Sequence, residues 1–271
     1  MLDLTDRIEL PRGVAVAPGG VSDAVRGESW PANDTAVFVL ARAGRPLGDV
    51  AGELAGRFGL PAERARRDVL AFVWGLNRSL LLNIVPARGP LARAASWVVL
   101  AIRLAPAGVL PRSPARRSPL DTSSAWGALA SAARATVRRG LAFVLVAVVL
   151  AAELAATAGA GGLLLPALGA VAVGAGLVLH EAGHAVALRG IPAALVLDGI
   201  RTYVLHRPLP GRRRALVAAS GPCAAAAAGA SLLAVAQLAG SAELAVASCP
   251  LGAHLLALTV LSGDGRTACA L

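Results

Sequence analysis

The sequence predicts an α+β amino-terminal domain with a winged-helix-like fold, followed by an all-α polytopic membrane bundle of about four transmembrane helices. Three observations support this prediction. Residues 1–88 alternate short β-prone runs with amphipathic helical patterns, residues 140–271 consist mainly of long apolar runs, and 56% of the chain is hydrophobic. A composition this apolar is typical of a membrane protein, and the length leaves room for one small soluble domain. We expect residues 89–139 to link the two parts.

The amino-terminal domain is expected to begin with strands and to continue with helices. Val-rich runs at 14–17 and 35–40, each next to turn residues, favour strands. Apolar residues then recur at helical spacing in 50–58 and 62–77, with a Gly-Leu-Pro break between them. Residues 79–85 predict a short closing strand. This order of elements indicates a small winged-helix-like fold.

The linker is expected to contain an interfacial helix and a flexible segment. Residues 91–110 are apolar in patches but include Arg and Pro, which favours a helix lying on the membrane. Residues 111–124 are rich in Pro, Ser and Arg, so we expect them to be flexible. An amphipathic helix at about 125–139 would then lead into the membrane.

Four apolar runs follow the linker and are candidate transmembrane spans. They cover about 141–158, 163–188, 215–239 and 242–261. Each is near or above the ~20 residues that a helix needs to cross the hydrocarbon. The second and fourth spans should both end on the cytoplasmic side.

The distribution of charge predicts the orientation of the chain. Of the formal charge of +10, +1 belongs to residues 1–90 and +9 to residues 91–271, where Arg gathers between the apolar runs. Arg-rich connections stay on the cytoplasmic side, so this pattern favours contact with membrane lipid and not with nucleic acid. The first residues lack the basic start and apolar core of a signal peptide. We expect a multi-pass protein of the inner cell membrane with a cytoplasmic amino-terminal domain.

The segment His180-Glu181-Ala-Gly-His184 lies at the end of the second apolar run and indicates a metal site. Two His four residues apart share one face of a helix, so both imidazoles can reach a single ion. Glu181 would stand beside the open coordination position, where it can take a proton from water. Three ionisable groups within five positions are costly in hydrocarbon and need a reason. The alternative is a polar helix end at the membrane surface.

A catalytic zinc ion takes three protein ligands and leaves one position for water, so a third ligand is required. The polar candidates in or near the spans are Glu153, Gln237, Glu243, His254 and Asp264. The predicted topology places Asp264, just after the fourth span, at the depth of the His pair. The alternative for Asp264 is a solvated turn. His254 is an alternative ligand, a partner of a ligand, or a His hydrogen-bonded within the bundle.

Three motifs occur in order over about residues 140–271. They are His180-Glu-Ala-Gly-His184, Ala219-Ser-Gly221-Pro222 and Ser262-Gly-Asp264-Gly-Arg266. In this order they resemble the site-2 protease family of intramembrane zinc metalloproteases. The resemblance implies that His180, His184 and Asp264 hold Zn²⁺ and that Glu181 is the catalytic general base.

The chain departs from that family in residues that help to orient the substrate backbone. An Ala run stands where the family usually has an Asn after its Gly-Pro, and Leu256 and Thr259 stand where it tends to have Asn and Pro. We also expect a hairpin within 189–214, at the membrane surface, that pairs with an extended substrate. The candidate substrate-binding residues are Gly221, Pro222, Tyr203 and His254.

Three other patterns in residues 5–85 resemble PqqD-like peptide-binding domains, which accompany ribosomally made, modified peptides. They are Trp30-Pro-Ala-Asn33-Asp-Thr-Ala36, Gly44-Arg-Pro-Leu-Gly-Asp-Val-Ala-Gly-Glu-Leu, and the Phe58-Gly-Leu-Pro pattern that runs on to Leu76. The resemblance implies that a leader peptide adds as a strand to an exposed sheet edge beside a helix groove. The alternative is a winged-helix domain with another partner.

These observations predict a membrane-embedded zinc metalloprotease whose amino-terminal domain presents a peptide or protein substrate, such as the leader of a modified peptide. Tethering the substrate would raise its effective concentration at the buried site. The alternative is a non-catalytic membrane-anchored peptide-binding scaffold or export partner. A third possibility is regulated cleavage of a membrane-anchored signalling protein.

Overall fold

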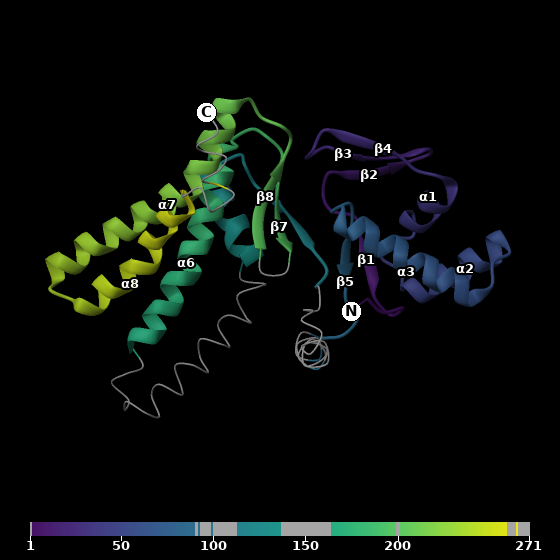
Figure 1. Ribbon diagram of the computed structural model, residues 1–271, viewed down its shortest axis with the longest axis horizontal. Coiled ribbons are helices and arrows are strands. Elements are labelled where there is room, and N and C mark those ends of the chain that lie inside the picture. Colours follow the sequence, from purple (N-terminus) through teal and green to yellow (C-terminus); the bar gives the residue numbers. More distant parts are fainter. Residues whose placement is uncertain are drawn as a thin grey trace. The chain divides into compact units, whose positions relative to one another are not determined.

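The computed structural model describes residues 2–89, 92, 99, 113–136, 164–198, 201–258 and 264. The chain divides into two compact units (Figure 1). The first unit comprises Met1–Pro119 and Val196–Leu205, and the second comprises Leu120–Leu195 and His206–Leu271. The expected span at 141–158 and nearly all of the expected interfacial helix at 91–110 lie outside the described residues.

Two small antiparallel sheets lie within residues 7–85 of the first unit. Strand β1 (Arg7–Glu9) pairs with β5 (Asn83–Val85), which joins the two ends of the domain. Strands β2 (Val14–Ala17), β3 (Gly20–Asp23) and β4 (Glu28–Pro31) form a meander in that order. The second strand agrees with the run predicted at 14–17, and the closing strand falls inside the predicted 79–85.

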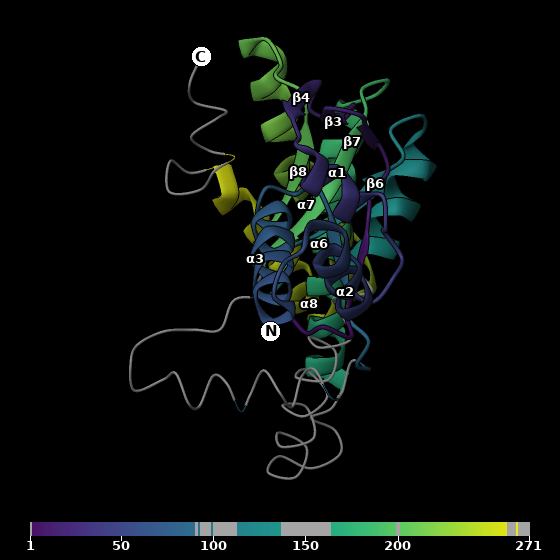
Figure 2. The same cartoon turned by 90° about the vertical axis from the view of Figure 1, so that its right-hand side faces the viewer.

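Three helices cover this unit and supply most of its core. They are α1 (Asp34–Leu40), α2 (Leu47–Phe58) and α3 (Ala62–Arg78), and α2 packs along α3 (Figure 2). The last two agree closely with the helices predicted from apolar spacing. The largest fully buried apolar side chains of the unit are Ile8, Leu40, Leu47, Leu54, Leu82, Val39, Val50, Val69 and Val73.

The prediction of a strand at 35–40 is wrong, because this segment forms α1. The side chain of Asn33 caps the helix by accepting a hydrogen bond from the Ala36 N–H at 2.9 Å. The successive residues Phe38, Val39 and Leu40 are all buried. A half-buried strand would expose every second residue, so continuous burial and the cap favour the helix over the β-propensity of Thr and Val.

The segment expected to be flexible, 111–124, contains strand β6 (Arg116–Leu120), which the first unit holds through two Asn side chains. Asn77 accepts from the Ala115 N–H at 2.9 Å and donates to the Ala115 carbonyl at 2.7 Å. Asn83 makes the same pair of bonds with the backbone of Arg117, both at 2.8 Å. Each side-chain amide bonds both the N–H and the carbonyl of one residue in the extended segment. These bonds fix which residues of the segment lie opposite Asn77 and Asn83.

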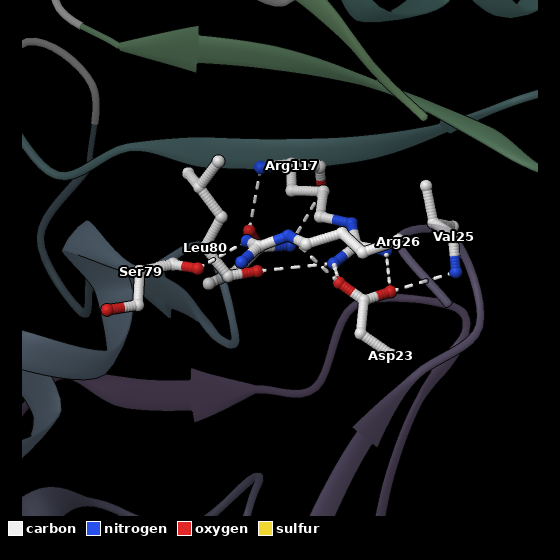
Figure 3. Close-up of polar contacts among 7 residues, drawn as sticks. Asp23, Val25, Arg26, Ser79, Leu80 and Arg117 are labelled. Atoms are coloured by element: carbon white, nitrogen blue, oxygen red, sulfur yellow. Dashed lines mark hydrogen bonds and ion pairs between the residues drawn. The ribbon is translucent and has the colours of Figure 1, made fainter. Parts of the chain in front are cut away.

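Arg117 secures this strand further through a buried ion pair with Asp23 (Figure 3). Its two terminal nitrogens donate to the two carboxylate oxygens at 2.6 and 2.7 Å, and both side chains are almost fully buried. Arg117 also donates to the carbonyl of Leu80 at 3.3 Å. This bidentate geometry is the strong form of an Arg–carboxylate contact.

The second unit is built around three helical segments that pack against one another (Figure 1). They are α6 (Leu164–Ala187), α7 (Gly211–Ala239) and α8 (Ala242–Gly252), and α8 continues into the 3₁₀ helix η3 (Ala253–Leu258). Residues 125–136 are also helical, which agrees with the helix predicted at 125–139.

Two of these helices are long and apolar enough to cross a membrane, within Ala167–Ala187 and over Gly211–Ala239. Only a third of each apolar window is buried inside the structure. The prediction of four transmembrane helices is not supported. Of the expected fourth span, 242–261, the structure describes residues up to Leu258. This stretch, Ala242–Leu258, contains Pro250, continues as a 3₁₀ helix from Ala253, and is shorter than the other two helices.

A third sheet contains the connection between α6 and α7. Its strands are β6, β7 (Ala193–Asp198) and β8 (Arg201–His206), in that order. The two strands predicted within 189–214 are therefore present as neighbours. Within the described part of the chain, β8 is an edge of this sheet.

Candidate metal centre

Helix α6 places His180 and His184 one turn apart on the same face. Their rings lie edge to face with centroids 4.8 Å apart. His184 is only 6% exposed, and the side chain of His180 is 12% exposed. Two imidazoles in such a shielded position have few water molecules to bind, so their ring nitrogens need partners within the protein.

The structure brings Asp264 to this pair from 80 residues further along the chain. One oxygen, Oδ2, lies 3.2 Å from His180 Nε2 and 3.6 Å from His184 Nε2. One ligand atom from each of the three residues lies within 4.8 Å of the others. The topology predicted Asp264 at the depth of the His pair, and this placement agrees with it.

The hydrogen bonds of His184 determine which nitrogen faces the cluster. Its Nδ1 lies 2.6 Å from the backbone carbonyl of Val217 on α7. A carbonyl oxygen only accepts hydrogen bonds, so Nδ1 carries the proton. In the neutral ring Nε2 then has a lone pair directed towards Asp264, as is usual for a His that binds a metal through one nitrogen.

Asp264 brings a carboxyl group to the point where the two rings meet. Its side chain is 33% exposed. An ionised carboxylate only accepts, so the group offers a negatively charged oxygen to a proton or a metal cation at this point.

These three groups fit a tetrahedral zinc ion. Two neutral Nε2 atoms and a carboxylate oxygen are all acceptors, and acceptors this close together repel unless a proton or a metal cation lies between them. Ligands about 2.0–2.1 Å from one zinc ion lie about 3.3–3.4 Å apart in a tetrahedron. The distances from Asp264 Oδ2 to the two nitrogens, 3.2 and 3.6 Å, agree with that value, and all three ligand atoms lie within 4.8 Å of one another. Two His and one carboxylate leave a fourth position open.

Gly221 and Pro222 allow α7 to approach the His pair. A side chain on Gly221 would collide with the ring of His184 and would reach to 2.8 Å from the carbonyl of His180. Pro222 lies inside α7, where a proline removes one helical hydrogen bond and loosens the preceding turn. The carbonyl of Val217 lies just before that turn and also accepts from the hydroxyl of Ser220 at 2.7 Å. The Gly-Pro motif therefore has a packing role, and its role in substrate binding stays a prediction.

Glu181 and Gly183 lie between the two His on the same helix. Glu181 is only 5% exposed, although it carries a carboxyl group. A side chain at Gly183 would lie 2.5 Å from the carbonyl of Ser220 on α7, so only glycine fits at this crossing. Close packing of the two helices thus shields the cluster, as a polar site in an apolar bundle requires.

Of the other residues that the sequence offered for the site, one lies beside the His pair. His254 on η3 lies 3.1 Å from His180, between the two Nδ1 atoms. Tyr203 on β8 belongs to the first unit and is 39% exposed, so its substrate role stays a prediction. Glu243 accepts a hydrogen bond from the hydroxyl of Ser241, which caps α8, and Glu153 lies outside the described residues. The partner carbonyl of Val217 was not predicted, because a backbone acceptor has no signal in the sequence.

The fold and the site define a protein of two parts, an α/β unit with a helical unit that carries a candidate His-His-Asp metal centre. Residues 13–81, roughly a quarter of the chain, match the family described as Coenzyme PQQ synthesis protein D (PqqD). The chain therefore carries a PqqD domain, which confirms this resemblance within the predicted 5–85. No curated protein and no solved structure matches the chain. The resemblance of the bundle to site-2 proteases rests on its motifs and stays a prediction.

Proposed function

We propose that this protein is a membrane-embedded zinc metalloprotease and that its PqqD domain presents the substrate. The substrate is a peptide or protein, such as the leader of a ribosomally synthesised modified peptide. One observation carries the proposal: His180 Nε2, His184 Nε2 and Asp264 Oδ2 converge within a shielded helix crossing. This donor set is that of a catalytic zinc site with an open position.

His180, His184 and Asp264 would hold the ion, and the ion supplies Lewis-acid activation of a water molecule and of the scissile carbonyl. Glu181 directly follows His180 and is buried, so it is not a surface carboxylate that interacts with water only. This position favours a role in proton transfer. It removes a proton from the attacking water and delivers it to the leaving amine. His184 keeps its orientation because its Nδ1–H donates to the carbonyl of Val217.

The PqqD domain gives the proposal its substrate class. PqqD domains bind peptide substrates in modified-peptide biosynthesis, so a peptide partner is consistent with this chain. A domain joined covalently to the site raises the local concentration of the bound peptide. The apolar side chains exposed on the two long helices support a position in lipid. They are Val171, Val173, Val186, Leu216, Leu233, Val235 and Leu238.

The proposal is tested by separating zinc binding from cleavage. The full chain is purified in detergent, its zinc content is measured, and it is incubated with a library of proteome-derived peptides whose products are identified by mass spectrometry. We expect about one zinc ion per chain and cleavage by the wild type. Glu181→Gln should keep the zinc and lose cleavage by at least about 100-fold, because the general base is removed.

The matched control is Glu243→Gln, which changes an exposed Glu at the start of α8 and should cleave like the wild type. Cleavage by Glu181→Gln at the wild-type rate would contradict the assigned base. If the wild type binds peptides but neither it nor any variant cleaves them, the chain is the non-catalytic peptide-binding scaffold or export partner. The PqqD match favours that second function if the first fails.

A further inference from the structure

We propose that His254 is a positioning residue that holds the ring of His180 so that Nε2 faces the metal. This inference rests on the proposed zinc site. His254 lies on η3, 74 residues after His180, and the two Nδ1 atoms are 3.1 Å apart. The ring centroids are 5.0 Å apart, and the two rings are tilted by 45°.

The two rings can form this hydrogen bond only if one of the two nitrogens carries the proton. Nε2 of His180 faces Asp264 and must keep its lone pair for a metal, so in the neutral ring its proton is on Nδ1. His180 therefore donates from Nδ1, and His254 accepts with Nδ1. His254 holds its own proton on Nε2. The acceptor fixes both the tautomer and the rotation of the first ligand.

The same geometry excludes His254 as a ligand of the ion that His180 binds. Nδ1 and Nε2 lie at opposite edges of the imidazole ring, and the N–H of one and the lone pair of the other point apart. His254 contacts the Nδ1 edge, whereas Asp264 and the metal position lie at the Nε2 edge. Of the roles that the sequence left open, the geometry therefore favours that of a partner of a ligand.

Helix α6 is shaped to receive this ring. Gly176 lies one turn before His180, on the same face of the helix. A side chain at Gly176 would lie 2.8 Å from Nε2 and 3.2 Å from Cδ2 of His254, and 3.4 Å from Leu251. The absent side chain leaves a slot for the imidazole, while His180 offers the donor one turn further on. Two residues of α6 thus specify the position of His254.

The rings of His184 and His180 are both oriented by a hydrogen bond from Nδ1, but the acceptors differ. His184 donates to a backbone carbonyl of α7, and His180 donates to the imidazole of His254. A backbone carbonyl cannot be replaced by mutation, but His254 can. The chain therefore offers a direct way to measure what this orientation contributes to metal binding.

The test measures the zinc dissociation constant of the full chain in detergent by competition with a chelator, together with the absorption spectrum of the cobalt(II) form. His254→Leu should weaken zinc binding by about 10–100-fold, the range typical of lost partners of metal-binding His residues. His254→Asn keeps an acceptor and should recover part of that loss. The cobalt bands should shift in the Leu variant while the ion keeps two imidazole ligands.

Gly176→Ala tests the same contact with His254 still present. It should displace the ring and weaken zinc binding in the same direction, and adding it to His254→Leu should cause little further loss. His206→Ala is the control, since His206 is a partly exposed His that bonds the carbonyl of the next residue. It should leave zinc affinity unchanged.

Several outcomes would overturn the inference. Wild-type affinity and an unshifted cobalt spectrum in both His254→Leu and Gly176→Ala would show that the contact does not orient His180. Loss of one imidazole ligand in His254→Leu would show that His254 itself binds the ion. Failure of the proposed function has a different signature: the wild type would bind no zinc, or His180→Ala would bind as well as the wild type.

Discussion

At the scale of single residues, the candidate centre depends on what the non-ligand atoms of each His contact. The spacing of His180 and His184 predicts that they share a face, but spacing does not say which nitrogen points inward. That choice follows from the carbonyl of Val217 and the ring of His254, both of which reach the His pair from other elements. The packing of distant segments therefore determines which nitrogen points inward, and the sequence alone could not predict it.

Gly221→Ala tests the close approach of α7 to the ligands. The added methyl group would collide with the ring of His184 and press on the carbonyl of His180, so one of the two must move. We expect zinc affinity to fall by about 10–100-fold, as for other changes that misplace a ligand. The measurement is the same chelator competition with the full chain.

Gly174→Ala is the control for that change. Gly174 lies on α6, and a side chain there would meet nothing within 4 Å. This variant should bind zinc like the wild type. Equal affinities for Gly221→Ala and Gly174→Ala would mean that the Gly-Pro motif has no role in shaping the centre.

At the scale of elements, the local sequence pattern correctly predicted the helices that have a regular apolar face. It failed for segments whose secondary structure depends on a helix cap or on contacts with distant residues. The helical spacing in 50–58 and 62–77 agrees with α2 and α3. The Val-rich run at 35–40 follows an Asn cap and is helical. The sequence of β6 is rich in Pro and Arg and has no strand pattern. The segment forms a strand because the side chains of Asn77, Asn83 and Asp23 bind it.

The buried pair of Asp23 and Arg117 should make the stability of the first unit depend on pH. Burial raises the pKa of Asp23, but the hydrogen bonds and charge of Arg117 lower it further, so the folded pKa lies below the usual value. The unfolded chain then binds more protons than the folded one in acid. The stability that this carboxylate contributes is present above about pH 4 and is lost as the pH falls towards the folded pKa.

Asp23→Asn should lower the free energy of unfolding at pH 7 by about 3–5 kcal/mol, because it leaves a buried charge without its partner. It should also remove part of the acid dependence. Thermal unfolding of the full chain, followed by tryptophan fluorescence at pH 7 and pH 3, measures both effects. Asp68→Asn, which changes a largely exposed pair with Arg64, should behave like the wild type. Identical curves for both variants would contradict the account of β6.

At the scale of the whole molecule, composition predicted a soluble domain followed by an apolar helical part. Four membrane-length helices are not supported: the expected span at 141–158 lies outside the described residues, and the described part of the run at 242–261 is a shorter apolar stretch, Ala242–Leu258. Two helices of the described residues meet the length requirement, α6 within Ala167–Ala187 and α7 over Gly211–Ala239. The connection between them is rich in Arg, which favours the cytoplasmic side.

This orientation predicts the side from which single cysteines react. In a chain without its native Cys residues, Arg12→Cys and Arg207→Cys should resist a membrane-impermeant maleimide in intact cells and react after lysis. Ala239→Cys, at the far end of α7, should react in intact cells. All three positions are exposed in the structure. Labelling of Arg207→Cys and Arg12→Cys from opposite sides would contradict the topology, including the span expected at 141–158.

The central claim is that two imidazoles and one carboxylate hold a single zinc ion, and X-ray absorption at the zinc edge tests it most directly. The full chain with one bound zinc should show two imidazole ligands with oxygen completing the set, at about 2.0–2.1 Å. Asp264→Ala should lose oxygen scattering and keep both imidazoles. Sulfur neighbours at about 2.3 Å, or fewer than two imidazoles, would contradict the account.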